Sequence, residues 1–226
     1  MAFDVKKEYR ELYVPRKGPS IVEVPRITYV AVRGSGDPNE EDGAYRQAIA
    51  VLYGISYTIK MSKKGERQID GYVDFVVPPL EGFWWQDDVT GVDYAHKESF
   101  NWISVIRLPD FVGREDFDWA VAEATRKKKL DCSSAEYLTI DEGTCVQCMH
   151  VGSYDNEPAT VEAMHAYMEE HGYALDLTEA RLHHADLPER RAQGCTREAQ
   201  DRHSTPHRAR DNRSLCARAT ASLTGR

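Results

Sequence analysis

The spacing of apolar and polar residues predicts alternating strands and helices between residues 27 and 184. Apolar residues at every second position indicate strands, and apolar residues three and four positions apart indicate helices. Strands are therefore expected at 27–33, 71–77, 101–108 and 137–151, the last broken at 141–143, and helices at 43–61, 116–129 and 158–172. The segment 80–85 is expected to be a loop, because Pro78 and Pro79 stop the preceding strand, and 71–77 is expected to pair antiparallel with 101–108.

These elements form one strand–helix–strand–strand unit at about 25–130 and part of a second at about 131–184. Such units pair into an α+β sandwich with a cleft between the halves. We therefore expect two strand–helix–strand–strand repeats around a central ligand cleft. The second repeat is expected to be incomplete, because two strands should follow its helix and only Arg181–His184 begins one. Residues 1–24 are expected to be an extended lead-in.

The predicted helix at 43–61 carries two apolar rows. Its main stripe consists of Ala48, Ile49, Leu52, Ile55 and Ile59. Tyr53 and Tyr57 form a second row, one turn apart and about 100° away around the helix. A helix that is apolar on two sides usually contacts its sheet on one side, and another element or a cavity on the other.

Composition changes abruptly at Ala185. The last 42 residues contain nine Arg and five acidic residues, and they lack Ile, Val, Met, Phe, Tyr, Trp and Lys. The net charge of the whole chain is −8, so residues 1–184 carry −12 and the tail carries +4. A body this acidic argues against direct binding of a nucleic-acid backbone, which needs a basic face.

No apolar run is long enough to span a bilayer, and the N-terminus lacks the apolar stretch of a signal peptide, so we expect a cytoplasmic protein without membrane contact. The five Cys include the pair Cys145 and Cys148, three positions apart on a predicted strand. No second such pair completes a zinc site. The pair also lacks the strand-to-helix turn of a thioredoxin motif. Structural thiols are favoured over metal or redox chemistry, and neither a metal nor a cofactor is expected.

Several separate motifs occur in an order that resembles the GyrI-like small-molecule-binding proteins. They are YGISYTIKM at 53–61, PLEGFW at 79–84, PDFV at 109–112 and HVGSYDNEP at 150–158. The resemblance covers roughly residues 9–184. It implies two strand–helix–strand–strand repeats around a cleft that binds flat or apolar small molecules, in agreement with the pattern above.

The resemblance also offers an explanation for the tail. Related sequences continue with a stretch like EIYLSD and then VAPEKLKTVIRHP, whereas this chain continues ADLPERRAQGCTREAQDRHSTPH. With suitable codons, removing one nucleotide from codon 185 converts this tail into EIYLSDAHRVAPEKLKTVIRHP. We therefore predict that residues 185–226 are translated out of frame and disordered. The alternative is a genuine basic tail that binds an acidic partner.

The resemblance nominates wall residues for the cleft: Tyr53, Tyr57, Trp84, Trp85, Trp102, Met149 and Tyr154. Each has an alternative as ordinary core. Tyr57 could also hydrogen-bond a leaving phenolate or orient water, and Glu81 could be a second polar anchor or a solvated loop carboxylate. The family's catalytic base would be the Glu of EIYLSD, and this position is Ala185 here. His150, His183 and His184 are expected to be structural.

Two functions remain open at this point. One is a detoxification protein that binds an apolar or aromatic molecule and hydrolyses cyclopropane-bearing, DNA-alkylating compounds. The other is a binding module without chemistry, either a drug-sequestering protein or a gyrase inhibitor. No helix-turn-helix precedes the domain, which argues against a DNA-binding regulator. A monomer or a homodimer formed through an exposed strand edge is expected.

Overall fold

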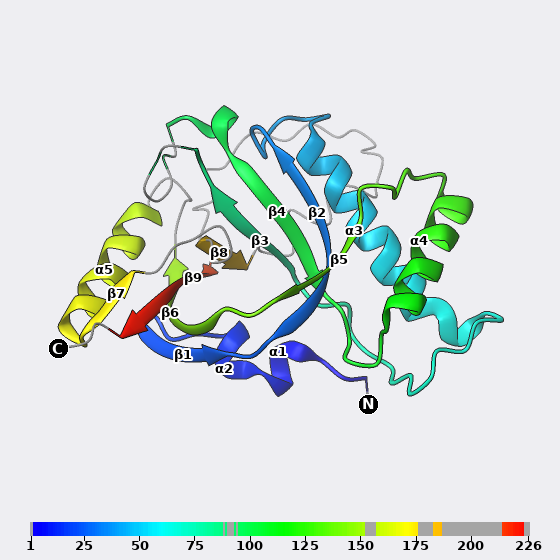
Figure 1. Ribbon diagram of the computed structural model, residues 1–226, viewed down its shortest axis with the longest axis horizontal. Coiled ribbons are helices and arrows are strands. Elements are labelled where there is room, and N and C mark those ends of the chain that lie inside the picture. The colour runs from blue at the N-terminus through cyan, green and yellow to red at the C-terminus, as the bar shows by residue number, and fades with distance from the viewer. Residues whose placement is uncertain are drawn as a thin grey trace, which may run out of the picture.

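The computed structural model describes residues 2–87, 89, 93, 95–151, 157–175, 183–186 and 214–223 (Figure 1). Its strands form one nine-stranded sheet in the order β1-β6-β9-β8-β3-β4-β2-β5, with β7 paired to β9. The strands are β1 (Ser20–Val24), β2 (Ile27–Ser35), β3 (Leu80–Trp85), β4 (Asn101–Arg107), β5 (Glu136–Ile140), β6 (Gly143–Val151), β7 (Tyr173–Leu175), β8 (His183–Asp186) and β9 (Ser214–Leu223). All the strand pairings are antiparallel, so the α+β class is confirmed.

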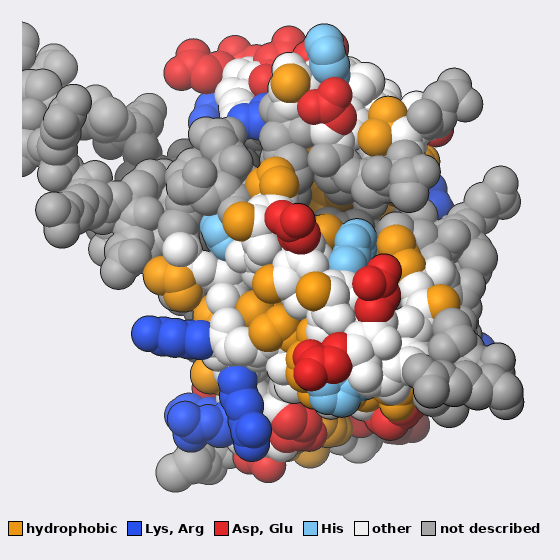
Figure 2. Space-filling model, turned by 90° about the vertical axis from the view of Figure 1, so that its left-hand side faces the viewer, with side chains coloured by type: hydrophobic (Ala, Val, Ile, Leu, Met, Phe, Trp, Pro, Cys, Tyr) orange, Lys and Arg blue, Asp and Glu red, His pale blue; other side chains and the backbone are white. Residues whose placement is uncertain are grey.

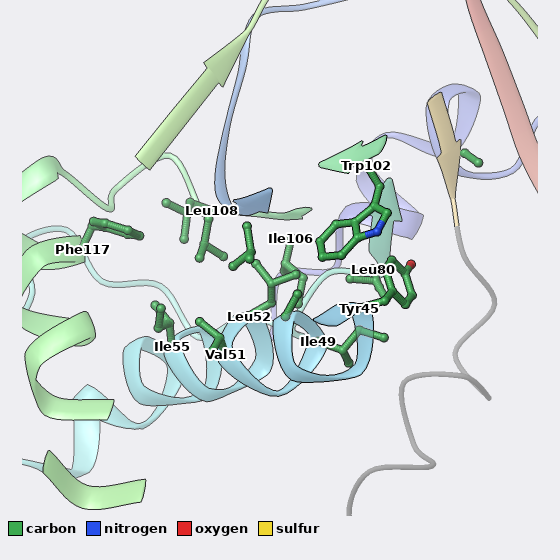
Figure 3. Packing of buried hydrophobic residues seen from close by; sticks show 14 of the residues in the cluster. Tyr45, Ile49, Val51, Leu52, Ile55, Leu80, Trp102, Ile106, Leu108 and Phe117 are labelled. Atoms are coloured by element: carbon green, nitrogen blue, oxygen red, sulfur yellow. The ribbon is translucent and has the colours of Figure 1, made fainter. Parts of the chain in front are cut away.

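Three helices contribute side chains to one hydrophobic core on one side of this sheet: α3 (Ala44–Met61), α4 (Arg114–Lys128) and α5 (Glu157–Glu170). The apolar stripe of α3 supplies Ile49, Leu52 and Ile55, which face Leu80 of β3 and Ile106 of β4 (Figure 3). Phe117 of α4 and Met164 of α5 belong to the same core. The helical period predicted for 43–61 therefore marks the side of α3 that packs on the sheet.

A bent two-stranded ribbon brings the two ends of the strand order together. β1 runs into β2 through Pro25 and Arg26, and β5 runs into β6 through Asp141 and Glu142. Val24 pairs with Gly143 before the bend and Ile27 pairs with Ile140 after it. Gly143 has a φ of 64°, a conformation that glycine adopts at little cost. The sheet therefore curves strongly and encloses a second core on its other face (Figure 1).

Residues 1–24 contain regular structure instead of the expected extended lead-in. Helices α1 (Val5–Glu8) and α2 (Arg10–Tyr13) precede β1, and Asp4 caps α1 by accepting a hydrogen bond from the Lys6 amide at 3.1 Å. Leu12 and Tyr13 of α2 are buried in the second core. The Asp4 carboxylate accepts a hydrogen bond from a backbone amide of α1, and buried apolar side chains anchor α2. Together these interactions explain why the segment is not extended.

The strand assignments around Pro78 and Pro79 differ from the prediction. Residues 80–85, expected to be a loop, form β3, which pairs with β4 from Leu80–Ile106 to Trp85–Asn101. Residues 71–77, expected to be that strand, hold only an isolated bridge between Phe75 and Phe3. The prolines therefore precede the strand that pairs with β4 rather than ending it, since neither has an amide hydrogen to donate within a sheet. Two short 3₁₀ helices, η1 (Ser62–Lys64) and η2 (Lys97–Ser99), complete the described elements.

The strands β8 and β9 occupy the end of the chain where two strands were expected to be missing. β8 pairs with β3, and β9 pairs with β6 and β8. Apart from the additional short strand β7 between α5 and β8, the order β6, α5, β8, β9 follows the same sequence of element types as β2, α3, β3, β4. Residues 217–223 alternate apolar and polar residues, a pattern compatible with a strand. Two strands, β8 and β9, thus follow α5 and β7 in the described part of the chain, and they belong to the same curved sheet as the other strands.

Within the described part of the chain, no helix combines the length and the apolar character that crossing a bilayer requires.

Candidate functional site

Four aromatic side chains gather on the helix-covered face of the sheet, and we call them the aromatic cluster: Tyr45, Trp84, Phe100 and Trp102. The Tyr45 ring from α3 meets Trp102 of β4 edge-on at 5.1 Å between ring centroids, and it lies 5.4 Å from Trp84 of β3. Phe100 contacts Trp84 edge-on at 5.9 Å. Figure 3 shows the Trp102 ring and the Tyr45 ring at one end of the α3 stripe. Edge-on and tilted contacts of this kind fix ring orientation as well as burying area.

Two glycines make room for the indoles of this cluster. A Cβ on Gly34 would lie 2.3 Å from the Trp102 ring, and a Cβ on Gly82 would lie 2.7 Å from Nε1 of Trp84. Neither distance is compatible with a real side chain, so the Trp102 ring lies against the backbone of β2 and the Trp84 indole lies over the backbone of β3. The glycines therefore determine where both rings lie.

Small residues form a row across three neighbouring strands beneath the Trp84 indole. Gly82 of β3 pairs with Ser104 of β4 on one side and with Ala185 of β8 on the other. Ser104 is fully buried and Ala185 is 4% exposed. Ala185 belongs to the same core as Trp84, so position 185 lies on the helix-covered face. Directly opposite residues in antiparallel strands have Cβ atoms about 5 Å apart, so a side chain at 185 is close to the Trp84 indole.

A buried ionic cluster occupies the other face of the sheet and consists of Tyr13, Glu81, Glu142 and His184. His184 Nε2 lies 3.1 Å from Glu81 Oε2, and His184 Nδ1 lies 3.0 Å from Glu142 Oε2. The Tyr13 hydroxyl donates a hydrogen bond to Glu81 Oε1 at 3.3 Å. The His184 ring also stacks on Phe83 at 4.3 Å. Glu81 is fully buried, so the alternative of a solvated loop carboxylate is wrong.

Arg107 of β4 extends this cluster toward the N-terminal helices. Its guanidinium lies over the Tyr9 ring at 4.3 Å and 3.6 Å from Asp110. Burial lowers the pKa of Arg107, but the hydrogen bond to Tyr13 and the nearby charges raise it by more. The guanidinium is therefore a permanent cation beside the Tyr13 hydroxyl.

Glu81 and Trp84 lie on opposite faces of the sheet, although both were predicted for one site. Alternation along β3 sends Gly82 and Trp84 toward α3, and Glu81, Phe83 and Trp85 toward the second core. The half-buried Trp85 therefore lies on the face away from Trp84.

The remaining predicted wall residues that the structure describes lie in two further places. Tyr53 and Tyr57 stack on each other along α3 at 6.1 Å, and Tyr57 is 46% exposed. Met149 is half-buried on β6. It lies two residues after Gln147 and four after Cys145, so it shares their face of the strand, which is the α2 side. Tyr154 lies outside the described residues. The structure thus brings together Trp84, Trp102 and position 185, and it places Tyr53, Tyr57, Trp85 and Met149 elsewhere.

The structure also places the predicted structural histidines and cysteines. His150 Nδ1 lies 2.7 Å from Thr160 Oγ1 and links β6 to α5. Cys132, Cys145 and Cys148 are buried free thiols, and burial raises the pKa of Cys148. Cys145 and Cys148 point into the two different cores, as residues three apart on a strand do. Among the described residues, no group of His, Cys, Asp and Glu is arranged to hold a metal ion.

Sequence reasoning missed five residues of the site: Tyr45 and Phe100 of the aromatic cluster, Tyr13 and Glu142 of the buried ionic cluster, and Ser104 of the row beside Gly82. Tyr45 lies one helical turn before Ile49 on the stripe of α3, so the 3.6-residue period extended by one turn could have found it. Ser104 is the polar residue among the five interior positions of β4, 102–106, and a buried hydroxyl there is a recognisable exception. Glu142 gave no local signal, because only the curvature of the sheet brings it to His184.

The face at the α5 end of the molecule carries hydrophobic side chains near its centre, with acidic and histidine side chains between them (Figure 2). On this face the described Lys and Arg side chains lie toward one edge and do not form a band. The distribution agrees with the acidic charge of residues 1–184.

Comparisons with known proteins identify close relatives. Residues 18–191 match the family described as GyrI-like small molecule binding domain. A hydrolase encoded by lin2189 from Listeria innocua is 39% identical, with a TM-score of 0.82 over 98% of this chain and 100% of that one. Another structure described as a hydrolase from Listeria innocua is 38% identical, with a TM-score of 0.80 over 97% of this chain and 100% of that one.

A more distant likeness concerns the fold alone. The EcmrR–DNA complex is 12% identical, with a TM-score of 0.50 over 97% of this chain and 61% of that one. No curated protein sequence matches the chain. The family match covers most of residues 1–226, and it includes β3, β8 and the row from Ser104 to Ala185. The chain therefore belongs to the GyrI-like small-molecule-binding domain family.

Proposed function

We propose that the protein binds a flat apolar or aromatic molecule on the helix-covered face, beside the aromatic cluster and above the row formed by Ser104, Gly82 and Ala185. The observation that carries the proposal is the arrangement of Trp84 and Ala185. The indole lies over Gly82, and Gly82 pairs directly with Ala185. An aromatic wall beside a floor of small residues suits a planar ligand.

Two buried polar groups suggest what else the ligand carries. Trp102 Nε1 and Ser104 Oγ are buried, and within the described part of the chain neither has a hydrogen-bond partner. Burying an unpaired donor costs about 1–3 kcal/mol, so a ligand oxygen that accepts from these groups would recover that cost. A planar molecule with a carbonyl or phenol oxygen on its ring system fits both the wall and the donors.

The chemistry we propose for the intact site is hydrolysis of a cyclopropane conjugated to a ring carbonyl, in a detoxification role. Water oxygen bonds to the cyclopropane CH₂, the ring C–C bond breaks, and its electron pair moves to the carbonyl oxygen to give a phenolate. A carboxylate takes the proton from water and later returns it to the phenolate. The Listeria relatives described as hydrolases support this reaction class.

The carboxylate for this step would stand at position 185, where the chain has Ala. Glu81 lies on the opposite face in the buried ionic cluster, so it is not placed to act beside Trp84. With Ala at position 185, the chain therefore supports the second candidate, which is non-catalytic sequestration of the same ligand. A gyrase-inhibitor-like role would use the same domain without this chemistry.

Three proteins incubated with a cyclopropane-bearing alkylator test both candidates: the wild type, Ala185→Glu and the matched Ala185→Gln. We expect only Ala185→Glu to form more than one equivalent of ring-opened product per equivalent of protein. The wild type and Ala185→Gln should each bind and shield one equivalent of the alkylator without turnover. Protection without turnover in all three proteins would leave sequestration as the function. No protection by any of them would overturn the ligand proposal.

A further inference from the structure

We propose that the buried ionic cluster is a register clamp for β8, and that Glu81, Glu142 and His184 are positioning residues for residue 185. Binding and catalysis at 185 rest on the proposed function, but the clamp itself does not. The cluster lies on one face of β8 through His184, and residue 185 is the next residue on the other face.

The contacts of His184 specify one register only. His184 pairs directly with Phe83, and their rings stack at 4.3 Å. Glu81 lies two residues before Phe83 on the same face, and its carboxylate meets Nε2 of the same imidazole. Moving β8 by one residue would turn His184 toward the helix-covered face and would remove Ala185 from it.

On the other face of β8, the pairing of Ala185 offers little to fix that register. β8 has four residues, and Ala185 pairs with Gly82, which has no side chain. Cross-strand side-chain contacts normally supply much of the specificity of an antiparallel pair. Almost none are available between Ala185 and Gly82. The polar contacts on the opposite face therefore help to distinguish the correct pairing with β3, a registry role that buried polar groups are known to serve.

Glu142 anchors His184 from a different element than Glu81 does. Glu81 lies on β3, next to β8, whereas Glu142 lies at the bend of the ribbon. Both imidazole nitrogens of His184 lie within 3.1 Å of carboxylate oxygens, so carboxylates from two different elements hold one ring. The Tyr13 hydroxyl donates to the other oxygen of Glu81, which leaves Oε2 for His184. The clamp thus ties β8 to β3, to the ribbon bend and to α2.

Hydrogen exchange of the full chain, followed by mass spectrometry of its peptides, tests the clamp without any ligand. Glu142→Gln keeps the side-chain shape but removes the carboxylate. We expect at least about tenfold faster exchange in the peptide that contains residues 183–186, with the β4 peptide unchanged. The matched control is Glu136→Gln, which alters an exposed carboxylate paired with Arg33 and should leave both peptides as in the wild type.

Equal exchange of residues 183–186 in Glu142→Gln and the wild type would overturn the clamp. So would a wild-type peptide that exchanges as fast as an unfolded chain. If Glu142→Gln does not fold, Tyr13→Phe removes only a hydroxyl and should loosen the same peptide by a smaller factor; no change there would be equally decisive.

Turnover separates positioning from general stability. In the Ala185→Glu background, adding Glu142→Gln should lower kcat for ring opening by about tenfold or more and change KM less than about twofold, because the aromatic wall remains in place. A fall in kcat/KM that comes only from KM would contradict the positioning role. Absence of turnover in Ala185→Glu itself would refute hydrolysis, while the exchange experiment would still decide the clamp.

Discussion

Glu81 and Trp84 lie three residues apart on β3 and point to opposite faces of the sheet. Trp84 belongs to the aromatic cluster under α3, and Glu81 belongs to the buried ionic cluster with Tyr13 and His184. One strand therefore supplies a wall for the candidate ligand site and an anchor for the strand beside it.

The anchoring role predicts a large loss of stability for Glu81→Ala. This change leaves the His184 imidazole facing one buried carboxylate and the Tyr13 hydroxyl without its acceptor. Removing one member of a buried ionic pair costs about 3–5 kcal/mol, and urea unfolding should show a decrease of that size in the free energy of unfolding. Glu136→Ala, at an exposed ion pair with Arg33, should cost less than about 1 kcal/mol. Similar losses for the two variants would show that the cluster contributes no more than a surface pair.

The close approach of Gly34 to Trp102 makes a second prediction. Gly34→Ala places a methyl group where the indole lies, and overpacking of this kind costs about 1–3 kcal/mol or more. The thermal midpoint should fall, and the near-ultraviolet circular dichroism of the aromatic cluster should change. Gly18→Ala is the control, because its new methyl group would meet nothing within 4 Å. An unchanged midpoint in Gly34→Ala would mean that Trp102 can move aside freely.

Burial of Cys148 predicts slow alkylation and a defined pH dependence. Because the pKa of its thiol is raised above the ordinary 9.0, the folded state holds the proton more tightly than the unfolded state. The resulting stability is fully present below pH 9 and declines as the pH rises through the folded pKa. Peptide-resolved labelling with iodoacetamide at pH 8 should modify Cys148 slowly in the native protein and rapidly in urea. Equally rapid labelling in both states would contradict the burial of this thiol.

The strands and helices that depend on local periodicity could be predicted from the sequence. The stripe of α3 and the alternation of β2 and β4 identified those elements to within a few residues. β3 was missed because a run of Glu, Gly and three aromatic residues after two prolines has no clear period. Its identity as a strand depends on pairing with β4 and β8, which lie far away in the sequence.

The same reason limits what could be predicted of the site. Trp84 and Trp102 could be nominated from motifs, but the face on which each residue lies follows only once β3 is known to be a strand. The ionic cluster joins residue 13 to residue 81 and residue 142 to residue 184, and no local pattern connects them. For this reason the sequence could not show that Glu81 and the aromatic wall lie on opposite faces of the sheet.

The composition of residues 185–226 remains the basis of a prediction about the gene. At or near codon 185, the nucleotide sequence of the gene should contain one extra base. Without that base, the reading frame should encode EIYLSDAHRVAPEKLKTVIRHP. Removing that base should restore a Glu at 185, and the restored protein should be more soluble and more often monomeric than the present chain when both are compared by gel filtration. A gene in which no frame yields that stretch would establish the Arg-rich tail as genuine.

The most direct test of the ligand site compares two neighbouring tryptophans on opposite faces of β3. Calorimetric titration would use the ring-opened product of a cyclopropane-bearing alkylator, which cannot react with the protein. Trp84→Leu should weaken binding by about 10- to 100-fold, whereas Trp85→Leu should change the Kd by less than about threefold. Equal losses in the two variants, or a larger loss in Trp85→Leu, would contradict a binding site on the helix-covered face.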